Sequence, residues 1–317
     1  MTSQEKSPEK DQQPTVAMEA EVEGGVDRSP HVVMLSSPGM GHLIPLAEFA
    51  RCLAVHHGFS VTLVATADFA SSSGYRAFVD SLPPGVASVT LPPVDVPDGM
   101  GITATISLAI VESLPALRRI VSGLKRTVRL VAFVADLFGT DTFDLASEFD
   151  IPPFIFFASN LFLLSLSLHL PALHETMPRL PDPVTLPGCL PMHWADLPIV
   201  VKDWRTEEFT WLLHHLKRYE KAEGILVNSF QEMEPETAAV LKEKNPGQPP
   251  IHLIGEEGVV RREEISAAVA ELMEGEEGRA ARERVKQLQV AATAAAAVGG
   301  ASHQALAEVV AKWEDSS

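Results

Sequence analysis

The chain has 317 residues, of which 46% are hydrophobic, and its 42 acidic and 25 basic residues give a net charge of −17. The hydrophobic fraction is typical of a globular protein with a packed core, and the negative charge repels phosphate backbones, so we expect no nucleic-acid partner. The two cysteines are too few for a disulfide framework or a cysteine zinc site, and we expect a cytoplasmic protein.

The amino-terminal segment, residues 1–29, is polar and charged. It has neither the apolar core of a signal peptide nor the arginine-rich pattern of a transit peptide. We therefore expect a disordered tail over these residues.

Short apolar runs alternate with helix-like segments between residues 31 and 158. The runs predict strands at 31–37, 59–67, 87–94, 129–138 and 152–158. Apolar residues at helical spacing predict helices at 42–58, 104–124 and 139–150. This alternation predicts an α/β fold with a parallel, doubly wound sheet, which binds ligands at the carboxyl ends of its strands.

An apolar stretch at 151–174 has no formal charge and is long enough to be tested as a membrane span. Prolines and polar side chains interrupt it. We expect a buried strand followed by a core helix, and no membrane span.

The second half of the sequence changes character twice. Residues 177–200 are rich in proline and predict a long surface loop. The alternation then resumes, with helices predicted at 211–224 and 235–244 and strands at 225–230 and 249–255. After Gly255 the pattern predicts only helices, two charged ones separated near Gly275 and a terminal one at 301–317.

Two glycines lie between the first predicted strand and the first predicted helix, directly before His42. Gly39 and Gly41 fit the G-x-G start of a dinucleotide-binding turn. The third glycine position is Ile44, however, and the nearest acid, Asp68, lies past the end of the second strand. This partial fingerprint is weak evidence for a nicotinamide or flavin site.

His42 follows a strand and lies near a helix N-terminus, where the helix dipole favours the neutral imidazole. A neutral imidazole can act as a general base when a carboxylate orients its second nitrogen. Asp136, at the end of the fourth strand, is expected at the same edge of the sheet. Asp141 and Asp144 follow on the next helix, whose spacing points at least one of them away. The pattern equally allows a structural reading, in which His42 packs the turn and Asp136 caps that helix.

Adjacent histidines occur at 56–57 and 214–215 on predicted helices. Neighbouring side chains on a helix point in different directions. We therefore expect no metal site.

Five strings of the sequence together resemble the plant family 1 UDP-glycosyltransferases, in particular the branch described as hydroquinone glucosyltransferases. They are SSPGMGHLIPLAEFARCL, VADLFGTDTFDLA, LPGCLPMHWADLP, WLLHHLKRYEKAEGILVNSFQEMEP and GVVRREEISAAVAELMEGEEG. The resemblance extends in the family's order from Ser29 to Trp313. It implies a GT-B fold of two Rossmann-like domains, with the acceptor held mainly by the first and the UDP-sugar mainly by the second.

The resemblance also implies roles for single residues. His42 corresponds to the catalytic base that deprotonates the acceptor hydroxyl, and Asp136 to its carboxylate partner. The acceptor-pocket positions are Leu137 and Phe138, and the positions near the UDP-sugar are Ser37, Gly41 and Ser159. The implied reaction is inverting transfer of a sugar, glucose, from a UDP-sugar co-substrate to a small phenolic acceptor, with no metal or other cofactor.

The sequence departs from the family pattern after Gly255. The family continues into a second Rossmann-like domain with a signature box that binds the nucleotide sugar, but no H-C-G-W-N-S string occurs in these 317 residues. We expect 30–255 to be the acceptor domain and 256–317 to be a helical remnant of a truncated C-terminal domain. Transfer is then expected to be weak or absent, because the groups that stabilise charge on departing UDP are missing. The alternative is a non-catalytic acceptor-binding or regulatory protein.

The terminal helix is expected to dock on the first domain, as in the family, and to bury four apolar side chains. These are Leu306, Val309, Val310 and Trp313. The two helices before it are expected to expose apolar faces, which would favour self-association.

Overall fold

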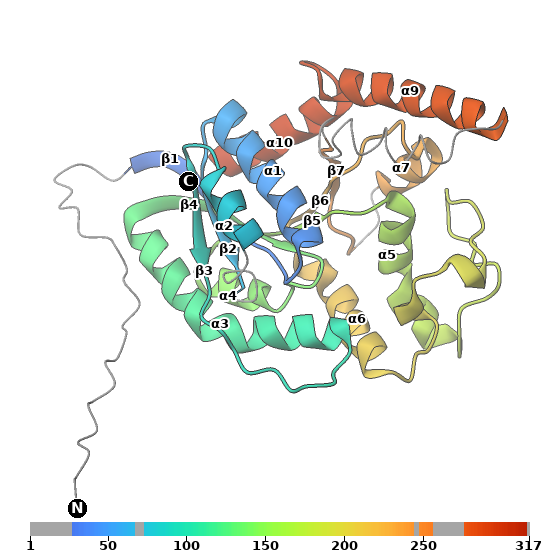
Figure 1. Cartoon of the computed structure of the whole chain (residues 1–317), viewed down its shortest axis with the longest axis horizontal. Coiled ribbons are helices and arrows are strands. Elements are labelled where there is room, and N and C mark those ends of the chain that lie inside the picture. Colours follow the sequence, from blue (N-terminus) through green and yellow to red (C-terminus); the bar gives the residue numbers. More distant parts are fainter. Residues whose placement is uncertain (1–26, 67–72, 244–246, 256–275, 316–317) are drawn as a thin grey trace, which may run out of the picture.

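The computed structural model describes residues 27–66, 73–243, 247–255 and 276–315 (Figure 1). Most of the predicted tail and the charged helix predicted before Gly275 lie outside these residues. The tail prediction extends slightly too far, because the first strand already begins at Asp27.

Seven parallel strands form one sheet in the order β3-β2-β1-β4-β5-β6-β7, which confirms the predicted parallel, doubly wound sheet. The strands are β1 (Asp27–Leu35), β2 (Ser60–Ala65), β3 (Val86–Thr90), β4 (Val128–Asp136), β5 (Pro153–Phe157), β6 (Gly224–Val227) and β7 (Ile251–Leu253). The strand order reverses between β1 and β4. In an open parallel sheet, such a switch point leaves a crevice at the carboxyl ends of the two strands.

The described helices are α1 (Met40–His57), α2 (Ser73–Asp80), α3 (Ile102–Thr127), α4 (Thr142–Glu148), α5 (Leu161–Thr176), α6 (Glu207–Arg218), α7 (Pro235–Leu241), α9 (Glu276–Ala296) and α10 (Ala301–Asp315). All but α2 were predicted. This helix has only eight residues, and Tyr75 anchors it by packing into the core beside β3. Tertiary packing, rather than propensity, therefore accounts for α2.

Side chains of successive strand residues point to opposite faces of the sheet and build two apolar layers. Val33 and Leu35 belong to the layer covered by α3, α4, α5, α6 and α7. Val32 and Met34 belong to the layer covered by α1, α2 and α10 (Figure 1). The sheet is buried on both faces, as its near-continuous apolar strands predict.

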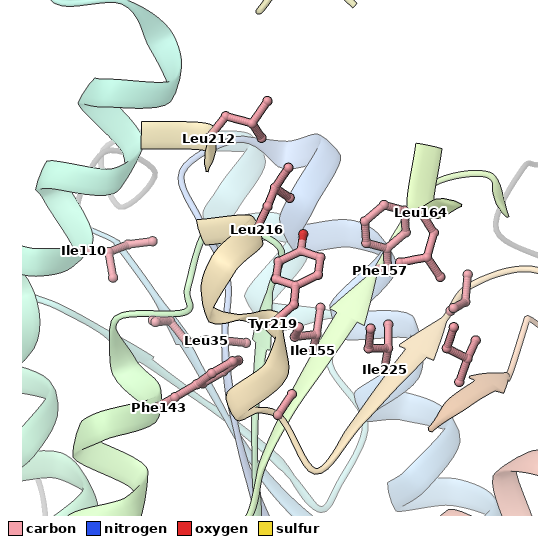
Figure 2. Packing of buried hydrophobic residues seen from close by; sticks show 14 of the residues in the cluster. Leu35, Ile110, Phe143, Ile155, Phe157, Leu164, Leu212, Leu216, Tyr219 and Ile225 are labelled. Atoms are coloured by element: carbon pink, nitrogen blue, oxygen red, sulfur yellow. The ribbon is translucent and has the colours of Figure 1, made fainter. Parts of the chain in front are cut away.

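The layer under α6 contains a buried tyrosine. A short turn, Tyr219–Lys221, joins α6 to β6, and Figure 2 shows the Tyr219 ring close to Leu216 and Ile155. Its hydroxyl is buried and has no hydrogen-bond partner among the described residues. Burial raises the pKa of Tyr219, so the phenol stays protonated.

The stretch at 151–174 forms β5 and the first part of α5, which confirms the predicted strand and core helix. None of the described helices combines the length and apolarity needed to cross a bilayer.

The loop predicted at 177–200 is only partly a surface loop. Val184 and Met192 pair as an isolated antiparallel bridge, and short turns form at Trp194–Asp196 and Ile199–Val201. Four of its side chains are buried in the core, Leu180, Val184, Leu186 and Leu197. These apolar anchors hold the irregular backbone against the helical layer.

The terminal helix α10 docks on the sheet as predicted. The exposed fractions of its four apolar side chains are 3% for Leu306, 1% for Val309, 7% for Val310 and 0% for Trp313. The Trp313 ring lies edge-on to Phe59 and Phe154, with centroids 6.0 and 5.1 Å away. The carboxyl-terminal helix is thus part of the core of the described domain.

Helix α9 is less exposed than predicted. Ala292 and Ala295 pack against Phe230, while Val290 and Val298 remain exposed. The predicted self-association through this region stays a prediction, as does the domain assignment for 256–317.

Candidate active site

The two residues that the sequence singled out lie at the switch point of the sheet. Leu35, the last residue of β1, is in register with Ala135 of β4, so both strands end at the same level. Asp136 is the last residue of β4, and His42 lies in the first turn of α1, just after β1. The fold therefore brings together side chains that are 94 positions apart in the sequence.

Gly39 is required at the turn before α1. Its φ is +121°, a backbone conformation that L side chains rarely adopt, and a Cβ there would lie 3.2 Å from Cδ2 of His42. The glycine therefore allows the turn and leaves room for the imidazole ring.

Asp136 binds His42 directly. The His42 Nδ1 lies 3.1 Å from Oδ2 of Asp136, with the two side chains 25% and 3% exposed. Oδ2 also accepts the Ser37 N–H at 2.8 Å, and Oδ1 accepts the Ser37 hydroxyl at 2.6 Å and the Phe138 N–H at 3.1 Å. A carboxylate that only accepts hydrogen bonds requires a proton on His42 Nδ1, which leaves a lone pair on Nε2.

The electrostatics of His42 differ from the prediction. Burial lowers its pKa, but the hydrogen bond and the negative charge of Asp136 outweigh this, so the pKa lies above the ordinary 6.5. The prediction from the helix dipole alone, which favoured the neutral ring, omitted this contact. The pair is suited to accept a proton and to stabilise the imidazolium that results.

The structural alternative fails for Asp136. The N-cap residue of α4 is Asp141, not Asp136. Asp141 and Asp144 also point away from His42, toward α6, where they bind His214 and Arg218.

The other predicted site residues lie near this edge of the sheet, at different distances from His42. The Phe138 ring is 5.7 Å from the His42 ring, whereas Leu137 packs half-buried against the core. Gly41 is exposed on α1, and an added Cβ there would meet no atom within 4 Å. Ser159 follows β5 at the same edge of the sheet. Ser37 donates its hydroxyl to Asp136, and its predicted place near the UDP-sugar stays a prediction.

His214 and His215 do not diverge as predicted from helix geometry. Each has a ring nitrogen near Asp141, and the three ligand atoms lie within 4.8 Å of one another. However, the His215 nitrogens already bind the hydroxyls of Ser107 and Thr140, at 2.7 and 2.8 Å. Hydrogen bonds thus occupy the ring nitrogens that a metal would need.

Sequence reasoning missed the place of His215 behind the site. Its ring centroid lies 5.8 Å from that of Phe138, and the Phe138 ring also contacts the His42 ring. Burial lowers the pKa of His215 to about 4, so the ring is neutral at pH 7. Only the buried face of α6 could have indicated this, because no local motif links α6 to Phe138.

Comparison with known proteins gives relatives but no matching family model. The UDP-glycosyltransferase 72B3 of Arabidopsis thaliana is 46% identical over 235 residues, which are 72% of this chain and 49% of the relative. The hydroquinone glucosyltransferase of Rauvolfia serpentina is 42% identical over 237 residues, which are 73% of this chain and 50% of the relative. The chain thus spans about half the length of the curated relatives it matches.

Solved structures share the fold. UGT2 of Phytolacca americana, solved with UDP-2fluoro-glucose and pterostilbene, has a TM-score of 0.70 at 36% identity and covers 77% of this chain and 57% of its own. A UDP-glucosyltransferase of Polygonum tinctorium capable of glucosylating indoxyl, solved with 3,4-dichloroaniline, has a TM-score of 0.69 at 42% identity, covering 74% and 55%. These likenesses confirm the Rossmann-like domain of a GT-B fold. Over the part that the comparisons cover, the chain therefore belongs to the plant UDP-glycosyltransferase family.

Proposed function

We propose that this chain provides the acceptor side of a UDP-sugar-dependent glycosyltransferase. His42 Nε2 takes the proton of a phenolic hydroxyl while the phenol oxygen forms a bond to the anomeric carbon of a UDP-bound glucose. The bond from that carbon to UDP breaks, UDP leaves with the electron pair, and the configuration inverts. The observation that carries this proposal is the buried Asp136 carboxylate hydrogen-bonded to His42 at the switch point of the sheet.

The acidity of the acceptor favours a phenol. A phenol has a pKa of about 10, whereas a hydroxyl as weakly acidic as water has one of about 15.7. Asp136 outweighs burial and raises the pKa of His42 above its ordinary value. The pKa of the base therefore lies nearer to that of a phenol than to that of an alkanol, which suits general-base catalysis of transfer to a phenol.

The surroundings of His42 and the ligands named with the relatives agree with an aromatic acceptor. Phe138 places an apolar ring beside the base, and we propose that Leu137 and Phe138 contact the acceptor. The relatives include a hydroquinone glucosyltransferase, an enzyme solved with pterostilbene and one capable of glucosylating indoxyl. We propose that Gly41 and Ser159 lie against the UDP-sugar.

Turnover by the 317-residue chain is proposed to be weak or absent. The family's H-C-G-W-N-S string, which belongs to the donor site, does not occur in the sequence. General-base chemistry alone contributes about 10² to 10⁴ in rate, which does not replace the groups that bind the donor and stabilise the leaving diphosphate. A non-catalytic acceptor-binding role is therefore the second candidate.

Calorimetric titration of the purified chain with hydroquinone, and separately with UDP-glucose, tests both sides of the proposal. We expect saturable hydroquinone binding that His42→Ala weakens and that His56→Ala, an exposed histidine on the same helix, leaves unchanged. Glucoside formation is followed by chromatography with mass detection.

Hydroquinone binding with no UDP-glucose binding favours the non-catalytic role. Glucoside formation that His42→Ala abolishes favours residual catalysis. If His42→Ala binds hydroquinone as tightly as the wild type, the proposed acceptor site is contradicted. Rapid glucoside formation by the wild-type chain contradicts the proposed impairment.

A further inference from the structure

We propose that Ser37 is a positioning residue that locks the Asp136 carboxylate and thereby sets the proton position on His42. This inference rests on the proposed role of His42 as the base. It gives Ser37 a task in proton transfer beside its predicted place near the UDP-sugar.

Ser37 contacts both oxygens of one carboxylate. Its N–H donates to Oδ2 of Asp136 at 2.8 Å, and its hydroxyl donates to Oδ1 at 2.6 Å. Ser37 is fully buried, and the Asp136 side chain is 3% exposed, so little water competes for these bonds. Two bonds from one residue fix the rotation of the carboxylate plane, which a single bond would leave free.

The backbone that presents Ser37 is itself fixed. The Ser36 N–H donates to the carbonyl of Val64 at 3.0 Å, and the Ser36 hydroxyl donates to the carbonyl of Ser37 at 2.9 Å. The turn after β1 is therefore tied to β2 on one side and to Asp136 of β4 on the other. The hydroxyl of Ser37 reaches Oδ1 from a rigid frame.

The orientation of this carboxylate decides the state of His42. The terminal torsion of an aspartate is broad, so it takes its angle from its hydrogen-bond partners. Without the Ser37 hydroxyl, Oδ1 keeps only the longer bond from the Phe138 N–H, while the Ser37 N–H still holds Oδ2. The carboxylate plane can then tilt about Oδ2 and lengthen the contact with His42 Nδ1. Burial lowers the pKa of His42, and Asp136 raises it. With a weaker contact to Asp136, the pKa of His42 would fall.

The test measures the pKa and tautomer of His42 by nitrogen-15 NMR, with the resonance assigned by its loss in His42→Gln. In Ser37→Ala we expect the His42 pKa to fall by about one unit and the share of Nδ1–H tautomer to drop, since an opposite charge at this range shifts a pKa by about 1 to 3 units. Ser36→Ala removes a neighbouring buried hydroxyl that bonds the Ser37 carbonyl but does not touch Asp136, and we expect a clearly smaller change. Ser37→Thr keeps the hydroxyl and should restore the wild-type values.

This readout needs no sugar donor, so it stays informative even when the chain transfers no sugar. An unchanged or higher His42 pKa in Ser37→Ala overturns the inference, because removal of a donor without loss of orientation makes the carboxylate a stronger acceptor. An equal fall in Ser36→Ala also overturns it. If Ser37→Ala does not fold, Ser37→Cys, with a weaker donor, is measured in its place and the same fall is expected.

Discussion

Trp313 gives a direct test of how far α10 stabilises the described domain. The side chain is fully buried against Phe59 and Phe154, and Trp to Ala changes at such sites cost about 3 to 5 kcal/mol. One term opposes this loss. The indole N–H is buried without a partner among the described residues, and such a group costs about 1 to 3 kcal/mol.

We therefore expect Trp313→Ala to lower the free energy of unfolding by about 2 kcal/mol. Trp313→Phe keeps an aromatic ring against Phe154 and removes the unpartnered N–H, so we expect a loss below about 1 kcal/mol. Val298→Ala, at a side chain that is 93% exposed, should change stability by less than about 0.5 kcal/mol.

Urea-induced unfolding followed by circular dichroism measures these differences. Hydrogen exchange of the α10 amides shows in addition whether the helix detaches before the sheet unfolds. If Trp313→Ala unfolds within about 0.5 kcal/mol of wild type, the helix does not contribute as the packing implies. Equal losses in Trp313→Ala and Trp313→Phe would contradict the assumption that a smaller aromatic ring keeps the contact with Phe154 and that the indole N–H is a cost.

Three further predictions concern the surroundings of the site. His215 has a pKa of about 4 in the folded chain and of about 6.5 in the unfolded chain, so the unfolded state binds a proton first as the pH falls. We therefore expect the free energy of unfolding to fall by about 3 kcal/mol between pH 6.5 and pH 4. Urea unfolding measures this loss, which His215→Asn should not show. A Cβ on Gly139 would lie 2.6 Å from Cβ of Ala135. Gly139→Ala should therefore lower the free energy of unfolding by about 1 to 3 kcal/mol in the same assay and weaken hydroquinone binding. At Gly41 an added Cβ meets no atom within 4 Å, so Gly41→Ala should lower it by less than about 1 kcal/mol. Glu234 accepts hydrogen bonds from the N–H groups of Leu161 and Phe162 at the start of α5. Glu234→Ala should lower the free energy of unfolding by about 1 to 2 kcal/mol, and with it the melting temperature, and Glu234→Gln should lower both by less. An unchanged melting temperature in Glu234→Ala would contradict a capping role.

The sequence predicted the architecture because apolar periodicity is a local signal. Each of the seven strands is an apolar run bounded by turn residues, and their alternation with helices implies parallel pairing. His42 and Asp136 could be paired in advance because the carboxyl ends of parallel strands share one edge. The prediction needed only the ends of β1 and β4, not the side-chain geometry.

What was missed depends on contacts between distant segments. The hydrogen bonds from Ser37 to Asp136 were not predicted, because they depend on the register of β1 against β4. His214 and His215 both approach Asp141 because α6 packs across the start of α4, which helix geometry within α6 does not reveal. The prediction of a neutral His42 weighed the helix dipole but not the strength of the effect of Asp136, which outweighs burial and raises the pKa.

The proposed function requires that Asp136 make His42 a stronger base than burial alone would allow. The most direct measurement is the NMR titration of His42 in wild type and in Asp136→Asn. We expect a wild-type pKa above 6.5 and a variant pKa below 6.5, because burial remains while the carboxylate charge is lost. A wild-type pKa at or below 6.5, or one that Asp136→Asn leaves unchanged, would contradict the account.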